Sequence, residues 1–373
     1  MAASACLSVG GYSLLGHLMF PPCQATLLVL VAVLLCCSVV SQDTVVRAQS
    51  VVTPSTGLVI LDGVTVPDIG PLPSSAHGSD TERLKAKVEL GKQLYFDGRL
   101  SRNNEVSCAY CHIPGAGFAD PHPTSTGIGD QLGGRQAPTI LNTALNRLQF
   151  WDGRATSLEE QALGPIQNPI EMGETAEHLA AKLQDVPGYR QQFKAVFGEE
   201  VSLPRITEAI AAFERTLVST NSAFDKYMAG DSKAMSEAAI RGLRLFKDKA
   251  RCILCHNGLN FTDNQFHNLG VPQVGPQKQD LGRYEVTKQD RDRGAFKTPT
   301  LRSVLETAPY MHDGAFLTLD EVVEFLNRGG GANSHLSPLI KPLSLTDGDK
   351  QDLVAFLEAL TGEAPKLEVP MLP

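Results

Sequence analysis

Two copies of one short motif constrain this chain more than any other feature of its sequence. The copies read Cys108-Ala-Tyr-Cys111-His112 and Cys252-Ile-Leu-Cys255-His256. A C-x-x-C-H motif attaches haem c, because two thiols bond to the two vinyl groups of one porphyrin while the next histidine binds the iron. A dithiol redox pair and half of a zinc site are the alternatives. Since both copies carry the histidine, we expect two covalent haem c groups, with His112 and His256 as iron ligands.

The other four cysteines fall in an N-terminal leader, at positions 6, 23, 36 and 37. Residues 1–41 contain no Lys, Arg, Asp or Glu, and residues 25–40 form an almost wholly apolar run. That run is short for a membrane span, which needs roughly 20 apolar residues, and it suits a secretory signal. We therefore interpret residues 1–48 as signal peptide and leader, with an uncleaved anchor as the alternative. Export predicts a periplasmic protein in an oxidising compartment.

The charge balance limits the partners. The 373 residues include 33 Lys and Arg against 41 Asp and Glu, a formal net charge of −8. Nucleic acid is not expected as a partner, because phosphate binding requires a basic surface. An acidic protein suits a basic electron-transfer partner instead.

The stretch before each motif is similar, which indicates a loose duplication. Apolar residues at helical spacing predict one helix from about Asp80 and another from Ser236. Each helix carries Gly-x-x-Leu-aromatic, starting at Gly91 and at Gly242. Three further helices are predicted from periodicity and start signals, over residues 205–218, 318–326 and 346–360. Few segments have a strand pattern, so we expect a mainly α fold of two cytochrome-c-like domains.

The predicted organisation has five parts. An irregular lead-in covers residues 49–80, because Ser, Pro, Gly and Val dominate it. The N-terminal haem domain covers 81–230, the C-terminal haem domain covers 231–362, and a tail covers 363–373.

Longer motifs give a specific resemblance. The chain carries Gly-Gly-Arg-Gln-Ala-Pro-Thr from residue 133, Gln-Phe-Trp-Asp-Gly-Arg-Ala from 149, Phe-Lys-Thr-Pro-Thr-Leu-Arg from 296 and Ala-Pro-Tyr-Met-His-Asp-Gly from 308. Over residues 81–362 it resembles the bacterial di-haem cytochrome c peroxidases, and most of all their MauG-like branch.

The resemblance implies that peroxide binds at the His112 haem. Glu171 matches the catalytic acid of the family, and Gln161 and Pro165 match residues that shape the distal pocket. Such an acid is needed because a base must take a proton from bound peroxide and return it to the leaving oxygen. Trp151, the single tryptophan of the chain, matches a residue between the two haems and is expected to relay electrons.

The chain departs from the family at two axial positions. Ile128 stands where resting peroxidases carry a removable distal histidine, so the peroxide site is expected to be open without reductive activation. Leu326 stands where the second haem has Met or Tyr, and leucine cannot bind iron. Met311 could substitute for it, with a packed loop methionine as the alternative. His312 matches a family histidine, while His267 has no assigned role.

A calcium site is also implied by the resemblance. The family uses an Asn where this chain has Gln136, together with carbonyls around Thr307 and Pro309. Because Gln also offers an oxygen ligand, Ca²⁺ remains an expectation.

The predicted function is a di-haem c-type peroxidase that reduces H₂O₂ with electrons from a cytochrome c or cupredoxin. Two alternatives remain. A MauG-like oxidase of a protein or small molecule is favoured somewhat by the two axial departures. A di-haem electron carrier is disfavoured, because a carrier needs no distal acid. A homodimer is a further expectation.

Overall fold

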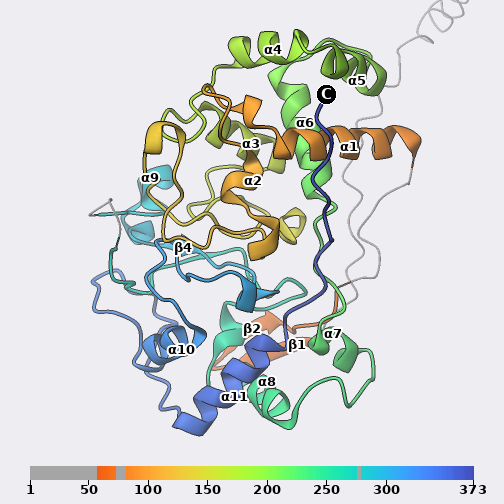
Figure 1. The fold of residues 1–373 in the computed structure, drawn as a ribbon. Helices are drawn as coiled ribbons and strands as arrows, with labels where there is room; N and C mark the ends of the chain where they lie inside the picture. Colours follow the sequence, from red (N-terminus) through yellow and green to blue (C-terminus); the bar gives the residue numbers. More distant parts are fainter. Residues whose placement is uncertain (1–56, 73–80, 275–278) are drawn as a thin grey trace, which may run out of the picture. The chain divides into compact units, whose positions relative to one another are not determined.

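The computed structural model describes residues 57–72, 81–274 and 279–373; the proposed leader lies outside these ranges. The fold is mainly helical, as expected (Figure 1). The helices of four residues or more are α1 (Glu82–Phe96), α2 (Cys108–Cys111), α3 (Leu158–Gln167), α4 (Ala176–Gln184), α5 (Pro187–Phe197), α6 (Leu203–Glu214), α7 (Ala223–Met228), α8 (Glu237–Lys247), α9 (Tyr284–Thr287), α10 (Leu319–Asn327) and α11 (Asp347–Glu358). Short 3₁₀ turns and loops connect them. No helix in the described ranges has both the length and the apolar character that a membrane crossing requires.

Two small antiparallel sheets complete the secondary structure. Strands β1 (Leu58–Leu61) and β2 (Val64–Pro67) form a hairpin in which Leu61 pairs with Val64. Strands β3 (Phe266–His267) and β4 (Phe296–Lys297) pair with His267 opposite Phe296. The hairpin corrects the prediction of an irregular lead-in. Its four-residue strands are too short to show an alternation of apolar and polar residues. Val66 packs the hairpin against a hydrophobic cluster of the C-terminal half.

The predicted helices form with small differences at their ends. Thr318 and Glu321 cap α10 reciprocally, as the sequence indicated. Helix α6 ends at Glu214 rather than at Val218. The chain turns there, and the Leu217 carbonyl accepts a hydrogen bond from the Asn142 backbone N–H at 2.9 Å. The sequence Ser157-x-x-Glu160 is typical of a capping box at the start of α3. Ser157 does cap the helix, but the Glu160 carboxylate accepts from Thr156 instead of from the Ser157 backbone.

Both halves are built on a helix crossing at a glycine. Helix α1 crosses α6 so closely that a Cβ on Gly91 would lie 1.9 Å from the carbonyl oxygen of Ala209. Helix α8 crosses α11 in the same way, and a Cβ on Gly242 would lie 1.9 Å from the carbonyl oxygen of Asp352. Figure 1 shows the two crossings. The Gly-x-x-Leu-aromatic repeat therefore marks the two close contacts, which place each following C-x-x-C-H motif.

Separate hydrophobic clusters surround the two crossings. The first half has one around Leu94, Phe193 and Ile210 and another around Tyr95 and Phe118. The second half has a cluster whose aromatic centre contains Phe224, Phe246, Phe261 and Phe356. All described residues nevertheless belong to one compact unit.

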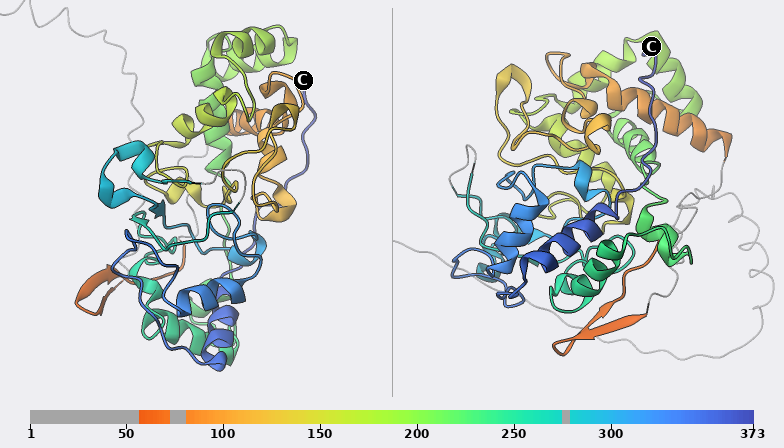
Figure 2. Two further views of the ribbon diagram at one scale, coloured as in Figure 1. Left: turned by 90° about the vertical axis from the view of Figure 1, so that its left-hand side faces the viewer. Right: turned by 60° about the horizontal axis from the view of Figure 1, so that its bottom comes forward.

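The segment after α11 returns to the first half (Figures 1 and 2). Ala364 and Leu367 pack against the cluster around Tyr95 and Phe118. The Arg99 guanidinium then donates to the carbonyl oxygen of Pro373 at 3.1 Å. The tail thus joins the two halves.

Candidate active site

The first C-x-x-C-H motif presents its histidine as a neutral metal ligand. Helix α2 begins at Cys108 and ends at Cys111, and the backbone N–H of His112 donates to the Cys108 carbonyl at 2.9 Å. Nδ1 of His112 lies 3.0 Å from the carbonyl oxygen of Pro138. This contact makes Nδ1 the donor and leaves Nε2 for the iron. Burial lowers the pKa of His112, so the ring stays neutral as a ligand requires.

The second motif repeats this arrangement on a 3₁₀ turn. The backbone N–H of His256 donates to the Cys252 carbonyl at 2.8 Å, and the ring Nδ1 lies 3.0 Å from the carbonyl oxygen of Phe261. Burial again lowers the pKa of the ring. The two halves therefore use the same device to fix the tautomer of the ligand.

The cysteines and the space beside them fit haem better than the alternatives. A cavity of about 380 Å³ adjoins the first motif and one of about 470 Å³ adjoins the second, both with mostly apolar walls. Burial raises the pKa of Cys111 to about 11 and that of Cys252 to about 12. Reactive dithiols have lowered pKa values, so a redox pair does not suit these thiols.

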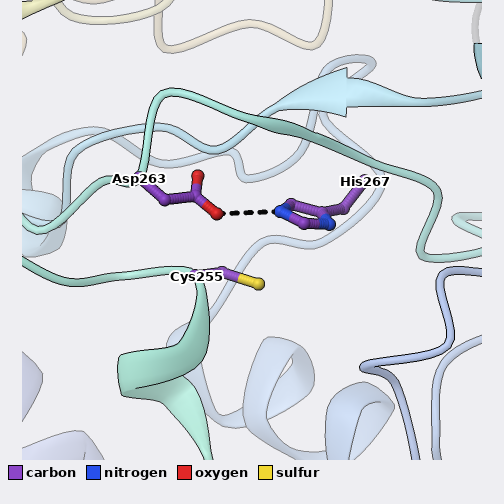
Figure 3. A group of neighbouring side chains, drawn as sticks. All are labelled: Cys255, Asp263 and His267. Carbon is purple, nitrogen blue, oxygen red and sulfur yellow. Dashed lines mark hydrogen bonds and ion pairs between the residues drawn. The ribbon is translucent and has the colours of Figure 1, made fainter. Parts of the chain in front are cut away.

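A further group of possible metal ligands lies at the second motif. Cys255, Asp263 and His267 have ligand atoms within 4.8 Å of one another (Figure 3). His267 Nε2 lies 2.9 Å from an Asp263 oxygen. Burial lowers the pKa of His267, but the bonds to Asp263 and Cys255 outweigh it and raise the pKa to about 10. Cys255 belongs to the haem-attachment motif, which leaves only Asp263 and the bonded His267, so this group is better explained as a bonded His–Asp pair beside a haem attachment.

The residues that resemble a distal pocket come together at the first cavity. Gln161 and Pro165 lie on α3, Glu171 follows that helix, and all three line the cavity. The Asn168 side chain, just past the helix end, donates to Glu171 Oε1 at 2.6 Å. Burial raises the pKa of Glu171, and although Asn168 and the positive charge of Arg154 oppose it, the pKa stays above the ordinary value.

Ile128 lies next to Glu171, because its backbone N–H donates to the Glu171 carbonyl at 2.8 Å. Its side chain packs over Gly173 and against the core, and it is not among the residues that line the first cavity. Among the described residues, His112 is the only histidine that lines that cavity. An open peroxide site without reductive activation stays a prediction.

Trp151 lines both cavities. Its indole N–H donates to the Gln136 carbonyl at 2.9 Å, and its carbonyl accepts from the Lys297 N–H at 2.7 Å. The first half therefore holds the ring, and the second half holds the backbone of the same residue.

A charged chain follows the same boundary. Arg135 forms two bonds to Asp280, at 2.6 and 2.8 Å, and a third to Asp152 at 2.7 Å. Asp152 also binds Arg154, whose charge acts on Glu171. Sequence reasoning missed Arg154, although it lies in the Gln-Phe-Trp-Asp-Gly-Arg-Ala motif.

The second cavity collects the remaining candidates. Leu326, Met311, Gln136, Thr307 and Pro309 all line it. So do three histidines besides His256: His267 pairs with Asp263, His335 lies 3.1 Å from Asp290, and His312 stacks on Phe296 with 3.6 Å between the ring centres. Met311 has a φ of +75°, in the left-handed region that non-glycine residues rarely adopt.

Two buried charged residues at the cavities form no ion pair among the described residues, and neither was predicted as a site residue. Glu214, at the end of α6, lines the first cavity, and its Oε2 has no hydrogen-bond partner among the described residues. Lys297 on β4 lines the second cavity. The sequence around each of them gives no sign of its burial.

Comparisons with known proteins agree with this geometry. A family model described as di-haem cytochrome c peroxidase matches residues 85–233. The chain is 43% identical to the cytochrome c551 peroxidase of Nitrosomonas europaea over 288 residues, 77% of this chain and 83% of the relative. It is 40% identical to the methylamine utilization protein MauG of Methylophilus methylotrophus over 295 residues, 77% of this chain and 86% of the relative.

Solved structures give the same answer. A MauG-like protein associated with microbial copper homeostasis has a TM-score of 0.70 at 31% identity, covering 80% of this chain and 94% of that one. The diheme peroxidase BthA from Burkholderia thailandensis has a TM-score of 0.67 at 25% identity, covering 83% and 96%.

Proposed function

This chain belongs to the di-haem cytochrome c peroxidase family, and we propose that it reduces H₂O₂ to water with electrons from a small donor protein. Its family implies two haem c groups, held through Cys108, Cys111 and His112 and through Cys252, Cys255 and His256. When bound, the haems supply the iron that exchanges electrons with peroxide and donor. One observation supports the proposal most: a half-buried carboxylic acid of raised pKa lines the cavity of one haem motif only.

The residues at the first cavity have separate roles in this proposal. The Glu171 carboxylate takes the proton from the nearer peroxide oxygen and returns it to the departing oxygen. Asn168 holds Oε1, which leaves Oε2 for the proton. Gln161 and Pro165 shape the wall of the first cavity. Pro165 adds rigidity to that wall, because its ring fixes the backbone and it has no N–H. Two electrons and two protons convert each H₂O₂ into two waters.

Trp151 is the proposed electron relay, since it contacts both cavities. The donor is a cytochrome c or a cupredoxin of basic surface. Arg154 keeps the rise in the Glu171 pKa within limits. We also propose residues 81–230 and 231–362 as the two haem domains, a homodimer, and export to the periplasm through the leader.

For the second haem we propose Met311 as the sixth ligand. Two histidines at this cavity are paired with aspartates and the third is stacked, whereas Met311 has a backbone conformation that requires compensation. The Met311→Leu variant should lose the charge-transfer absorption of a ferric His–Met haem. An unchanged spectrum would assign Met311 to loop packing.

Calcium is a separate proposal. Gln136 donates from Nε2 to the Asp120 carbonyl at 2.9 Å, which leaves Oε1 for a cation, and Thr307 and Pro309 line the same cavity. Without a carboxylate in this set, we expect weak binding. Calorimetric titration of chelator-treated holoenzyme tests it, and no heat of binding would exclude the site.

Peroxide turnover by the purified holoenzyme tests the main function. We expect steady oxidation of reduced cytochrome c, and a direct reaction when fully ferric protein is mixed with H₂O₂ in a stopped-flow instrument. Oxidation of a protein or small molecule without donor turnover would favour the MauG-like alternative. Donor oxidation that does not depend on peroxide would favour the carrier.

A further inference from the structure

Only two lysine or arginine side chains are fully buried in the part of the chain that the structure describes. Arg302, 1% exposed, has an ion pair with Asp225 at 3.1 Å and donates to the carbonyls of Leu259 and Gly70. Lys297, 7% exposed, has one contact at the limit of hydrogen bonding, 3.4 Å from Nζ to the Thr298 carbonyl. Among described residues no carboxylate lies within ion-pair distance of Lys297.

The acidic side chains around Lys297 already form hydrogen bonds with other residues. Asp263 attracts the ammonium at longer range but is bonded to His267. Asp280 is the only acid that lines the second cavity among the described residues, and both its oxygens bind Arg135. Lys297 therefore lacks the anion that a buried ammonium requires, because burial without a partner disfavours the charged form.

The anion has to come from the cavity, because Lys297 lines it. We propose that Lys297 forms an ion pair with a propionate of the haem bound at His256, and so holds a positive charge beside that haem. Haem c brings two propionate carboxylates, which match an ammonium in charge and in hydrogen bonding. The inference rests on the proposed function only in that the second cavity holds a haem.

The position of Lys297 gives this pair a role in electron transfer. Its backbone N–H donates to the Trp151 carbonyl at 2.7 Å, so one backbone hydrogen bond joins the lysine to the proposed relay. A fixed positive charge stabilises the reduced haem relative to the oxidised haem. Lys297 is thus a positioning residue that favours electron entry at the second haem.

Three variants of the holoenzyme test the pair. Lys297→Met keeps the length of the side chain and removes the charge, whereas Lys297→Arg keeps the charge. Lys249→Met removes a surface lysine of the same half, which pairs with Asp349. Reduction potentials of each haem are measured by redox titration followed by EPR.

We expect Lys297→Met to shift the reduction equilibrium of the His256 haem about tenfold toward the oxidised form, which is 59 mV for one electron. Lys297→Arg and Lys249→Met should stay within about threefold of the original. An unshifted potential in Lys297→Met with both haems attached overturns the inference.

If Lys297→Met fails to accumulate, resonance Raman spectra of the unaltered protein and Lys297→Arg decide. The propionate bending bands should show one strongly hydrogen-bonded propionate at the His256 haem, perturbed in the Arg variant; weakly bonded bands that do not change refute the pair. A protein that lacks two haems or peroxide turnover would instead refute the proposed function. Normal turnover with an unshifted potential refutes the Lys297 inference alone.

Discussion

Glu171 combines a raised pKa with a fixed hydrogen bond from Asn168. Glu171→Gln keeps the shape and removes the proton carrier, so we expect turnover to fall roughly 10²–10⁴-fold with haem spectra nearly unchanged. The rate should also fall as pH drops through the raised pKa, because protonation removes the base. Steady-state kinetics across pH measure both effects.

A matched control lies on the same region of the chain. Glu159, half-buried on α3, pairs with Arg215 and does not line the first cavity, so Glu159→Gln should retain full activity. A loss of less than about fivefold in Glu171→Gln would remove Glu171 from the mechanism.

Glu214 predicts a pH dependence of stability. Burial raises its pKa to about 8, so the folded state holds a proton that the unfolded chain releases above about pH 4.5. Stability from this group is therefore complete below pH 4.5 and is lost as pH rises to 8, by about 1.4 kcal/mol for each unit of pKa shift. Glu214→Gln should flatten this part of the pH–stability curve, measured by denaturant unfolding at pH 5, 6.5 and 8. An equal slope in both proteins would show that Glu214 is ionised when folded.

The sequence was most informative where chemistry is local. The two C-x-x-C-H motifs are recognisable because the chemistry of haem attachment fixes their spacing, whereas Glu171 was identified through the resemblance of the longer motifs. Glu214 and Lys297 could not be found in this way, because their burial depends on segments far apart in the chain. The same limit explains Ile128, whose direction is set by its packing over Gly173.

At the scale of elements, caps and periodicity predicted α1, α8, α10 and α11, since those signals lie within each helix. The β1–β2 hairpin was missed because its partner surface belongs to a distant cluster. The sequence shows the two helix crossings only as a repeated motif. The structure shows that the helices are in close contact there.

The crossings give a prediction about packing. Gly91→Ala and Gly242→Ala each place a methyl group against backbone of the facing helix, which cannot move aside as a side chain can. We expect each to cost about 3 kcal/mol or more, despite the better helix propensity of alanine. Thermal unfolding of the holoenzyme and the yield of attached haem measure the loss.

Gly348 is the control for these variants. It lies in the first turn of α11, and the nearest atom to a Cβ there is 3.9 Å away. Gly348→Ala should be neutral or stabilising by up to about 1 kcal/mol. Equal behaviour of all three variants would contradict the role of the crossings.

At the scale of the whole molecule, the tail joins the halves. Leu367 packs against the cluster around Tyr95 and Phe118, so Leu367→Asp buries a charge there and should cost about 1–3 kcal/mol. Val369 is 74% exposed, and Val369→Asp should change little. Unfolding followed at the spectrum of the His112 haem measures both, and no difference between them would show that the tail does not stabilise that half.

The two cavities have a consequence for how the protein matures. Both cavities have mostly apolar walls, and a haem bound in each would cover this surface from water. A group that binds only the folded chain stabilises it. A newly made chain should therefore be more open to proteases before its cysteines have been joined to haem than afterwards.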